Sequence, residues 1–232
     1  AVGLRWASKR PLVVPLGLAI HINGFGRKKK ERVISDFNSD SSWRVLDVTR
    51  EDREIDWYRR GVSVKGNTYW FAEPQRGIPN QGDSSFLISF DFTRETFGPR
   101  LPLPFEWCPA DVVSLSDVRD EQLAVLFQLE HILEMEIWVT TKIEPNMLSW
   151  GSKVFLSVDM TPLTGNDFMF SFMATSFFID EEKKIAVVFN QSKDRKHNTA
   201  FIIGQDGSLK EVDLGEVRNR DLKPLVCSYV PS

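Results

Sequence analysis

The sequence contains little of what secreted and membrane-spanning proteins usually show. It has two cysteines, Cys108 and Cys227, in 232 residues, whereas small disulfide-stapled secreted domains carry more of them at regular spacing. We therefore predict two reduced thiols, with one disulfide as the alternative, and an intracellular location in the cytoplasm, the nucleus or both. Residues 11–20 form an apolar run, but Pro11 and Pro15 interrupt it and it is too short to cross a bilayer. We expect no membrane association.

An excess of charge of one sign is also missing. The chain has 29 Lys and Arg against 32 Asp and Glu, a formal net charge of -3. Nucleic-acid-binding domains usually show a clearly basic surface, so we predict no nucleic-acid partner. One short basic run, residues 27–32, is expected to be a solvated hairpin tip; a nuclear import signal or a phosphate-facing patch is the alternative.

Signatures of catalysis and metal binding are scarce. The three histidines, His21, His131 and His197, are dispersed, and no nucleophile-elbow motif accompanies them. The segment Glu130–Glu136 contains carboxylates beside His131, a combination that suits several divalent metals. We interpret it instead as a solvated connection between strands. The sequence therefore predicts no catalytic residues, no metal site and no cofactor.

Strand and turn patterns fill most of the chain. Short runs of Val, Ile, Phe, Tyr and Trp alternate with Gly, Asn, Asp and Pro, a pattern typical of strands and tight turns. Residues 65–67 and 206–207 supply Gly and Asn where hairpins need a positive φ. No long stretch keeps a helical apolar period, and the best helix candidate is residues 50–59. Seventeen Phe and seven Trp are ample for a large core.

The strands are arranged in a repeat. An apolar strand, a polar turn and a second strand recur four times, and the second strand begins near residues 43, 97, 150 and 209. A further strand pair precedes three of these four pairs, so we interpret each repeat unit as four antiparallel strands. A kelch-type propeller blade has a period of about 50 residues. We predict an all-β, propeller-like (kelch-like) array of about four four-stranded antiparallel units, the first either complete or truncated; a β-sandwich is the alternative.

Two details of the repeat are further expectations. In the third unit, the strand at 136–139 should lead through a longer loop into a strand at 150–158. Near the C-terminus, Pro224–Val230 reads as one last strand, which would complete the sheet of the first unit and close the ring.

Eight segments of the sequence, taken in order, resemble those of the F-box-associated interaction domain of plant F-box proteins, a family often described as F-box and kelch-like. Together they cover about residues 33–232. We therefore predict an F-box-associated domain over 33–232, and a poorly matching segment over 1–32 that either stands apart or belongs to the first blade. The matching segments are Ser42–Thr49, Arg60–Trp70, Ile88–Phe92, Phe97–Pro104, Gln122–Gln128, Met135–Lys142, Ser176–Lys183 and Leu225–Ser232.

The resemblance implies a non-catalytic module that recruits substrate proteins to an SCF-type (Skp–cullin–F-box) ubiquitin ligase for ubiquitination. In the family, an F-box docks onto the Skp-type adaptor, which leads to the cullin. No segment of this sequence matches an F-box, so we expect that contact to be made from outside it. The alternatives are a stand-alone interaction or scaffold propeller without ligase coupling, and a propeller that binds a sugar or another small molecule.

Recognition on rigid scaffolds usually lies on the connections between strands. Trp, Tyr and Arg dominate the energetic hot spots of protein interfaces. We predict that Trp57, Tyr58, Arg59 and Trp107 contribute to binding the substrate protein; the alternative for each is burial under its loop or between units. The aromatic-rich stretch 168–172 has the same two interpretations. The expected long connections are 50–60, 73–85, 105–112, 129–134, 162–174 and 191–199.

Overall fold

The structure is a computed structural model. It describes residues 17–21, 31–35, 44–46, 53–55, 60–74, 84–129, 133–161, 170, 175–191 and 196–217. For the described residues up to 54, only the backbone is described. The chain divides into two compact units, residues 1–48 and 49–232. In the first unit, β1 (Gly17–His21), β2 (Glu31–Ser35) and β3 (Arg44–Leu46) form an antiparallel sheet in that order. The β2–β3 pairing confirms the first predicted strand pair.

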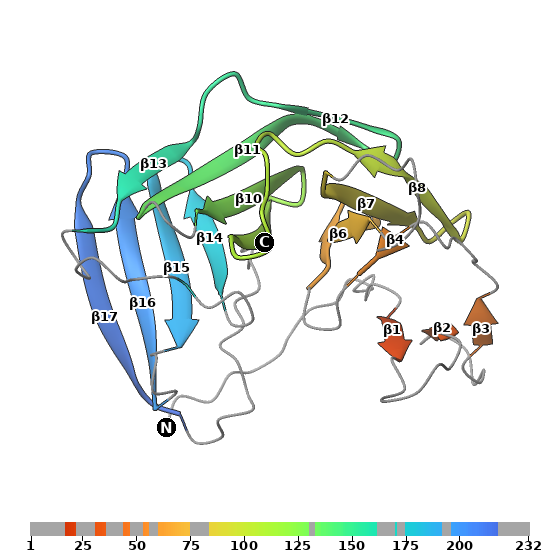
Figure 1. Cartoon of the computed structure of the whole chain (residues 1–232), viewed down its shortest axis with the longest axis horizontal. Helices are drawn as coiled ribbons and strands as arrows, with labels where there is room; N and C mark the ends of the chain where they lie inside the picture. Colours follow the sequence, from red (N-terminus) through yellow and green to blue (C-terminus); the bar gives the residue numbers. More distant parts are fainter. Residues whose placement is uncertain are drawn as a thin grey trace, which may run out of the picture. The chain divides into compact units, whose positions relative to one another are not determined.

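The second unit contains three antiparallel sheets (Figure 1). In the first sheet, β4 (Arg53–Glu54), β6 (Asn67–Pro74), β7 (Phe86–Asp91) and β8 (Thr96–Leu101) lie in that order, and β5 (Val62–Val64) also pairs with β6. The second sheet contains β9 (Val112–Val118), β10 (Gln122–Gln128) and β11 (Glu134–Glu144), with β12 (Met147–Trp150) and β13 (Leu156–Asp159) both along β11. The third comprises β14 (Ser176–Asp180), β15 (Ile185–Gln191), β16 (His197–Gly204) and β17 (Leu209–Glu216).

The all-β prediction and the strand pairs of the repeat are confirmed, with two corrections. Arg53–Glu54 form a strand that pairs with the end of β6, so the helix candidate over 50–59 is wrong at these residues. In the third predicted unit, β11 continues to Glu144 and turns at once into β12, so the expected longer loop is wrong. Pro224–Val230 lies outside the described residues. In the described part of the chain, no helix is long and apolar enough to cross a membrane.

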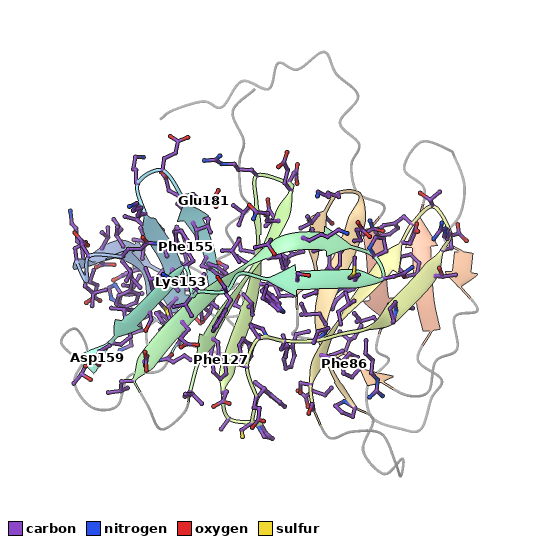
Figure 2. All side chains as sticks on the ribbon, turned by 90° about the horizontal axis from the view of Figure 1, so that it is seen from above. Phe86, Phe127, Lys153, Phe155, Asp159 and Glu181 are labelled. Carbon is purple, nitrogen blue, oxygen red and sulfur yellow. The ribbon has the colours of Figure 1, made fainter. Side chains whose placement is uncertain are left out.

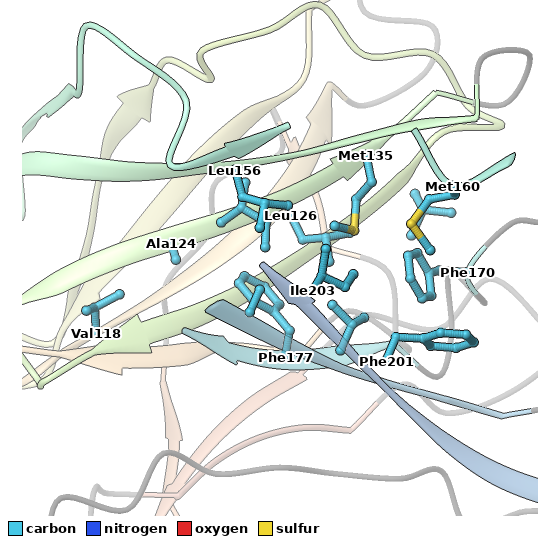
Figure 3. Close-up of a cluster of buried hydrophobic side chains, with 14 residues drawn as sticks. Val118, Ala124, Leu126, Met135, Leu156, Met160, Phe170, Phe177, Phe201 and Ile203 are labelled. Carbon is cyan, nitrogen blue, oxygen red and sulfur yellow. The ribbon is translucent and has the colours of Figure 1, made fainter. Parts of the chain in front are cut away.

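Strand β10 explains why the sheets pack face to face. Successive side chains of a strand point to opposite faces. Leu123, Val125 and Phe127 join the apolar cluster shared with the first sheet, whereas Ala124 and Leu126 join the cluster shared with the third sheet. Figure 3 shows the latter cluster between β10, β11 and the strands of the third sheet. Because both faces are buried, the run reads as continuously apolar in the sequence.

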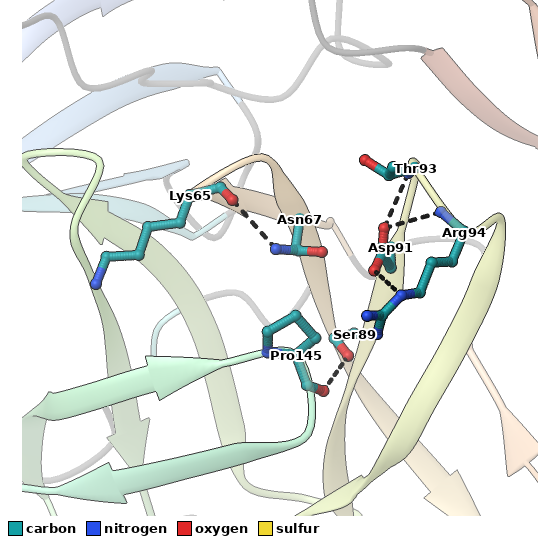
Figure 4. Close-up of polar contacts among 7 residues, drawn as sticks. All are labelled: Lys65, Asn67, Ser89, Asp91, Thr93, Arg94 and Pro145. Atoms are coloured by element: carbon teal, nitrogen blue, oxygen red, sulfur yellow. Dashed lines mark hydrogen bonds and ion pairs between the residues drawn. The ribbon is translucent and has the colours of Figure 1, made fainter.

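The β11–β12 hairpin fastens the second sheet to the first. Ile143 and Leu148, near its tip, are buried in the cluster shared with the first sheet. At the tip, the hydroxyl of Ser89 on β7 donates a hydrogen bond to the carbonyl oxygen of Pro145 at 2.7 Å (Figure 4). The indole N–H of Trp150 donates to the carbonyl oxygen of Pro102, beyond β8, at 2.9 Å. Apolar burial and two hydrogen bonds therefore set the relation of these sheets.

Gly98 on β8 allows this close approach, which gives a first prediction. A Cβ added at Gly98 would lie 2.3 Å from Ser89 Oγ and 2.5 Å from the carbonyl oxygen of Pro145. Overpacking of this kind costs about 1–3 kcal/mol, so we expect Gly98→Ala to lower the free energy of unfolding by that amount. Urea-induced unfolding measures it. A loss smaller than about 0.5 kcal/mol, the range of neutral surface substitutions, would show that the hairpin tip can move away.

Candidate functional site

One end of the three sheets of the second unit carries short turns. Residues 65–66, 92–95, 119–121, 181–184 and 205–208 form these turns, and we call this end the short-turn face. The backbone N–H of Lys65 donates to the carbonyl oxygen of Asp120 at 3.3 Å, which joins the first and second sheets. Arg119 forms ion pairs with Glu181 and Glu182 at 3.7 and 3.3 Å, which join the second and third sheets. The short-turn ends of these three sheets therefore lie on the same side of the second unit.

The opposite end, which we call the long-connection face, collects the longer connections. These are residues 75–85, 102–111, 129–133, 160–175 and 192–196, between the strand ends of β6 to β16. Figure 2 shows Phe86, Phe127 and Asp159 near this side and Glu181 on the other. Near this end, the Ser114 hydroxyl donates to the Thr175 carbonyl oxygen at 3.0 Å, so the second and third sheets are joined here too. The described strand ends that these connections join therefore lie on one face.

The predicted residues Trp57, Tyr58 and Arg59 lie outside the described residues, in the connection between β4 and β5. Glu54 of β4 pairs with Glu73, and Val62 of β5 pairs with Tyr69. Seven residues, 55–61, therefore connect β4 to β5, whereas only three residues of β6, 70–72, separate the two partners. We call residues 55–61 the inner-strand break, because they separate β4 from β5. Strand β5 is adjacent to β9 of the second sheet.

The fourth predicted residue, Trp107, lies against β6. Its indole packs edge-on against Phe71, with ring centroids 5.1 Å apart and planes at 64°. Phe71 is the middle one of residues 70–72, which lie between the β6 partners of β4 and β5. The structure thus brings Trp107 to the stretch of β6 that lies between the partners of Glu54 and Val62.

The connection that carries Trp107 is held by local contacts. Asp111 is buried, and its carboxylate accepts a hydrogen bond from the backbone N–H of Cys108 at 2.8 Å. The indole N–H of Trp107 donates to the carbonyl oxygen of Asp111 at 3.4 Å. Phe105 stacks on Phe127, with centroids 3.9 Å apart. Trp107 is half-buried, so its side chain is partly a structural contact, and its role in binding stays a prediction. Cys108 is an exposed free thiol.

Phe170 is the described member of the aromatic-rich stretch 168–172, and it is a core residue. Its side chain is 2% exposed and lies edge-on to Phe201 at 5.6 Å. Its backbone N–H donates to the side-chain oxygen of Gln128, itself fully buried, at 2.9 Å. For Phe170, burial is therefore the correct interpretation, and it anchors the connection between β13 and β14.

Electrostatic effects near the long-connection face are local. The hydroxyl and backbone N–H of Thr161 donate to Asp159 and lower the pKa of that carboxyl. Glu134 accepts a hydrogen bond from Ser157, and Glu136 accepts one from the indole of Trp138, so the two described carboxylates of the predicted solvated connection have protein partners. Glu130 and His131 lie outside the described residues. Within the described ranges, no group of three or more His, Cys, Asp or Glu could hold a metal ion.

Tyr69, two residues before Phe71 on β6, gives a second prediction. Its side chain is 1% exposed, and burial, with the Glu144 carboxylate second, raises the pKa of Tyr69 to about 12. Below the unfolded pKa of about 10 the phenol is protonated in both states. Between about pH 10 and 12 the unfolded chain loses this proton first, so stability falls as pH rises, by on the order of 2–3 kcal/mol in all.

We expect Tyr69→Phe to lack this part of the alkaline destabilisation. Lysines titrate in the same range, so the informative quantity is the difference between the wild type and Tyr69→Phe in urea unfolding at pH 9, 10, 11 and about 12. A constant difference across these pH values would mean that Tyr69 ionises as easily in the folded protein as in the unfolded chain.

Comparisons with known proteins agree with this architecture. The family described as F-box associated beta propeller domain matches residues 17–232. A putative F-box protein of Arabidopsis thaliana is 58% identical over 198 residues, which cover 83% of this chain and 49% of the relative. An F-box/kelch-repeat protein of the same plant is 51% identical over 215 residues, 88% of this chain and 53% of the relative. No solved structure matches.

The family match settles the architecture of the repeat. It begins at residue 17, earlier than the resemblance over 33–232 suggested, and the division at residue 32 stays a prediction. The chain spans about half the length of the curated relatives it matches. The all-β, propeller-like prediction is confirmed, with successive antiparallel sheets of three, five, five and four strands in chain order. The chain belongs to the F-box-associated β-propeller domain family.

Proposed function

We propose that this chain is the substrate-binding part of an SCF-type ubiquitin ligase, that it recruits proteins for ubiquitination, and that it has no catalytic residues of its own. The family match over residues 17–232 carries the proposal. The relatives' names support it, because they describe F-box and F-box/kelch-repeat proteins. The Skp-type adaptor and the cullin would be reached through an F-box outside this sequence, and the protein would act in the cytoplasm, the nucleus or both.

The topology supports protein binding at the long-connection face. Connections can vary in sequence without disturbing the packed strands, and they carry most recognition on rigid scaffolds. The sheets beneath are fixed to one another by apolar clusters on both faces of the second sheet. We propose that the substrate protein contacts Trp57, Tyr58 and Arg59 in the inner-strand break, together with Trp107.

The test is an affinity purification of the full-length natural protein from its own tissue, with mass spectrometry of the co-purifying proteins. We expect a Skp-type adaptor and a cullin among them, together with candidate substrates. The control is a known F-box protein purified in parallel. If the control retains the adaptor and cullin but this protein does not, ligase coupling is wrong, and the domain acts as a free-standing interaction module.

A further inference from the structure

Strand β17 is the outer edge of the third sheet. It pairs with β16 on one side, and within the described part of the chain no strand pairs with its other side (Figure 1). Among the outer strands of the second unit it is the longest, with eight residues against six for β8 and four each for β12 and β13. It contains no proline, whereas β8 contains Pro99. An unpaired edge of this kind is a template for another strand.

The ladder between β16 and β17 determines which backbone groups of β17 point outward. The N–H of Gly204 donates to the carbonyl oxygen of Ser208 at 2.8 Å, so these residues form a hydrogen-bonded pair. Hydrogen-bonded and non-hydrogen-bonded pairs alternate along an antiparallel ladder. Leu209, Glu211 and Asp213 are therefore in non-hydrogen-bonded pairs with β16. Their N–H and carbonyl groups point away from β16, toward the outer edge.

A bulge ends the regular part of this edge. Over residues 197–199 of β16 the ladder advances by two residues, whereas β17 advances by three, from Asp213 to Glu216. Gly215, within this bulge, has a φ of +92°. A bulge bends its strand and interrupts pairing. The edge that another strand can pair with is therefore residues 209–213.

The side chains along this edge differ between the two faces of the sheet. Leu209 packs against the cluster shared with the second sheet, and the alternation of side chains places Glu211 and Asp213 on the same face. Both acidic residues are exposed. On the other face, Lys210 is exposed and Val212 is half-buried. Opposite charges and apolar pairs stabilise neighbouring strands, so the edge favours basic residues opposite the acids and an apolar residue opposite Val212.

The same charges disfavour a second copy of β17 as the occupant. When two edges pair, the residues that point outward from each strand face one another in hydrogen-bonded pairs. Two of the three outward-facing residues of β17, Glu211 and Asp213, are acidic. Self-pairing would therefore bring acidic side chains together on one face, and like charges directly opposite one another are destabilising.

We propose that residues 209–213 bind an extended segment of a partner protein by strand addition, and that this segment alternates basic and apolar side chains. The inference deepens the proposed function, on which its biological role rests, by naming the kind of segment that a substrate protein presents. In strand addition, main-chain hydrogen bonds supply the affinity and alternate side chains supply the specificity.

Glu211→Pro tests the proposal, and Glu211→Ala is its matched control. Both variants remove the same carboxylate, but only proline also removes the outward N–H. This N–H points away from β16, so the ladder keeps its hydrogen bonds, and proline is tolerated at such edge positions. Asp213 is less suitable, because its carboxylate also contacts His197 Nδ1 at 3.6 Å and accepts the N–H of Gly215 at 2.8 Å.

The probe is a peptide of about eight residues, the length of an ordinary strand, in which Lys and Val alternate and both ends are blocked. Calorimetry measures its binding to the full-length protein. We expect a Kd of about 1 mM or lower for the wild type, and binding at least about 10-fold weaker for Glu211→Pro than for Glu211→Ala. No binding to the wild type, or equal binding to the two variants, would overturn the proposal.

A charge-reversing variant covers the case in which Glu211→Pro does not fold. Glu211→Lys changes an exposed side chain and keeps the N–H. We expect it to bind the Lys–Val peptide at least about 3-fold more weakly than Glu211→Ala, because like charges then stand opposite one another. Affinity equal to that of Glu211→Ala would show that the charge of this face does not select the segment.

Residue-resolved hydrogen–deuterium exchange locates the peptide on the strand. In the free protein, the N–H groups of Lys210 and Val212 point toward β16 and should exchange slowly, whereas those of Glu211 and Asp213 should exchange fast. We expect saturating peptide to slow exchange at Glu211 and Asp213 by about 10-fold or more. Binding without this change would place the peptide elsewhere and refute strand addition at β17.

The peptide experiment separates the failure of this inference from the failure of the proposed function, because no adaptor, cullin or natural substrate takes part in it. If the peptide binds at β17 but no ligase subunit co-purifies with the protein, ligase coupling fails and strand addition stands. If ligase subunits co-purify but the peptide leaves exchange in residues 209–213 unchanged, strand addition fails and the proposed function stands.

Discussion

Phe170→Ala is expected to lower the free energy of unfolding by about 3–5 kcal/mol, the range for removing a fully buried phenylalanine ring. The ring is enclosed by the cluster that joins the second and third sheets, next to Phe201 and Met160 (Figure 3). The surrounding strands are paired on both sides, so the cavity left by the ring can close only in part. Urea-induced unfolding measures the loss.

Phe178→Ala is the matched control, because Phe178 is half-buried on β14 of the third sheet. We expect it to cost less than half as much as Phe170→Ala. Gln128→Leu tests the same anchor in a second way, because it removes the acceptor of the buried N–H of Phe170. An unsatisfied buried donor lowers the free energy of unfolding by about 1–3 kcal/mol. If Phe170→Ala costs no more than Phe178→Ala, Phe170 is not an anchor of its connection.

The second large effect concerns partner binding. We expect alanine at Trp57, Tyr58 or Arg59 to weaken the partner identified by affinity purification by about 30-fold or more in the strongest case, which corresponds to a hot spot of about 2 kcal/mol. These residue types make large or charged contacts whose truncation leaves partner groups unpaired. Titration calorimetry with the purified partner measures the affinity, and thermal unfolding of each variant shows whether the domain is still folded.

Arg94→Ala is the control for the charge change. Arg94 is exposed on the short-turn face and pairs only loosely with Asp91, at 3.9 Å (Figure 4), a kind of surface pair worth little. We expect it to leave affinity and stability unchanged. Unfolded alanine variants at 57–59 would mean that these side chains belong to the core. Folded variants with full affinity would mean that residues 57–59 do not contact the partner.

The strands could be predicted from the sequence because their local signals agree with the fold. Gly66 has a φ of 75°, as its sequence indicated, whereas the second positive φ of the turn, 50°, falls on Lys65 and not on Asn67, which begins β6. The continuous apolar run of β10 indicated a strand buried on both faces. The third unit misled the same reasoning, because the polar residues Thr140–Lys142 resemble a loop. Ile143 and Leu148 bury against the first sheet, and this long-range contact keeps the hairpin extended.

The candidate site shows the same division. The aromatic and charged residues of the connections were visible in the sequence, but their neighbours were not. Trp107 packs on Phe71, and Phe170 is in the core rather than at a binding surface. No local pattern distinguishes a buried aromatic in a connection from an exposed one, because burial depends on the element that packs against it.

The sequence by itself determined the all-β class, the repeat and the family, because strand alternation, turn residues and segment order are local properties of the chain. The tertiary structure decided which ends of the sheets share a face, because it depends on strand register and on contacts such as Lys65–Asp120 and Ser89–Pro145. It also decided that Trp107 packs on Phe71. Residues far apart in the chain become neighbours only when the sheets pack, and no spacing in the sequence encodes that proximity.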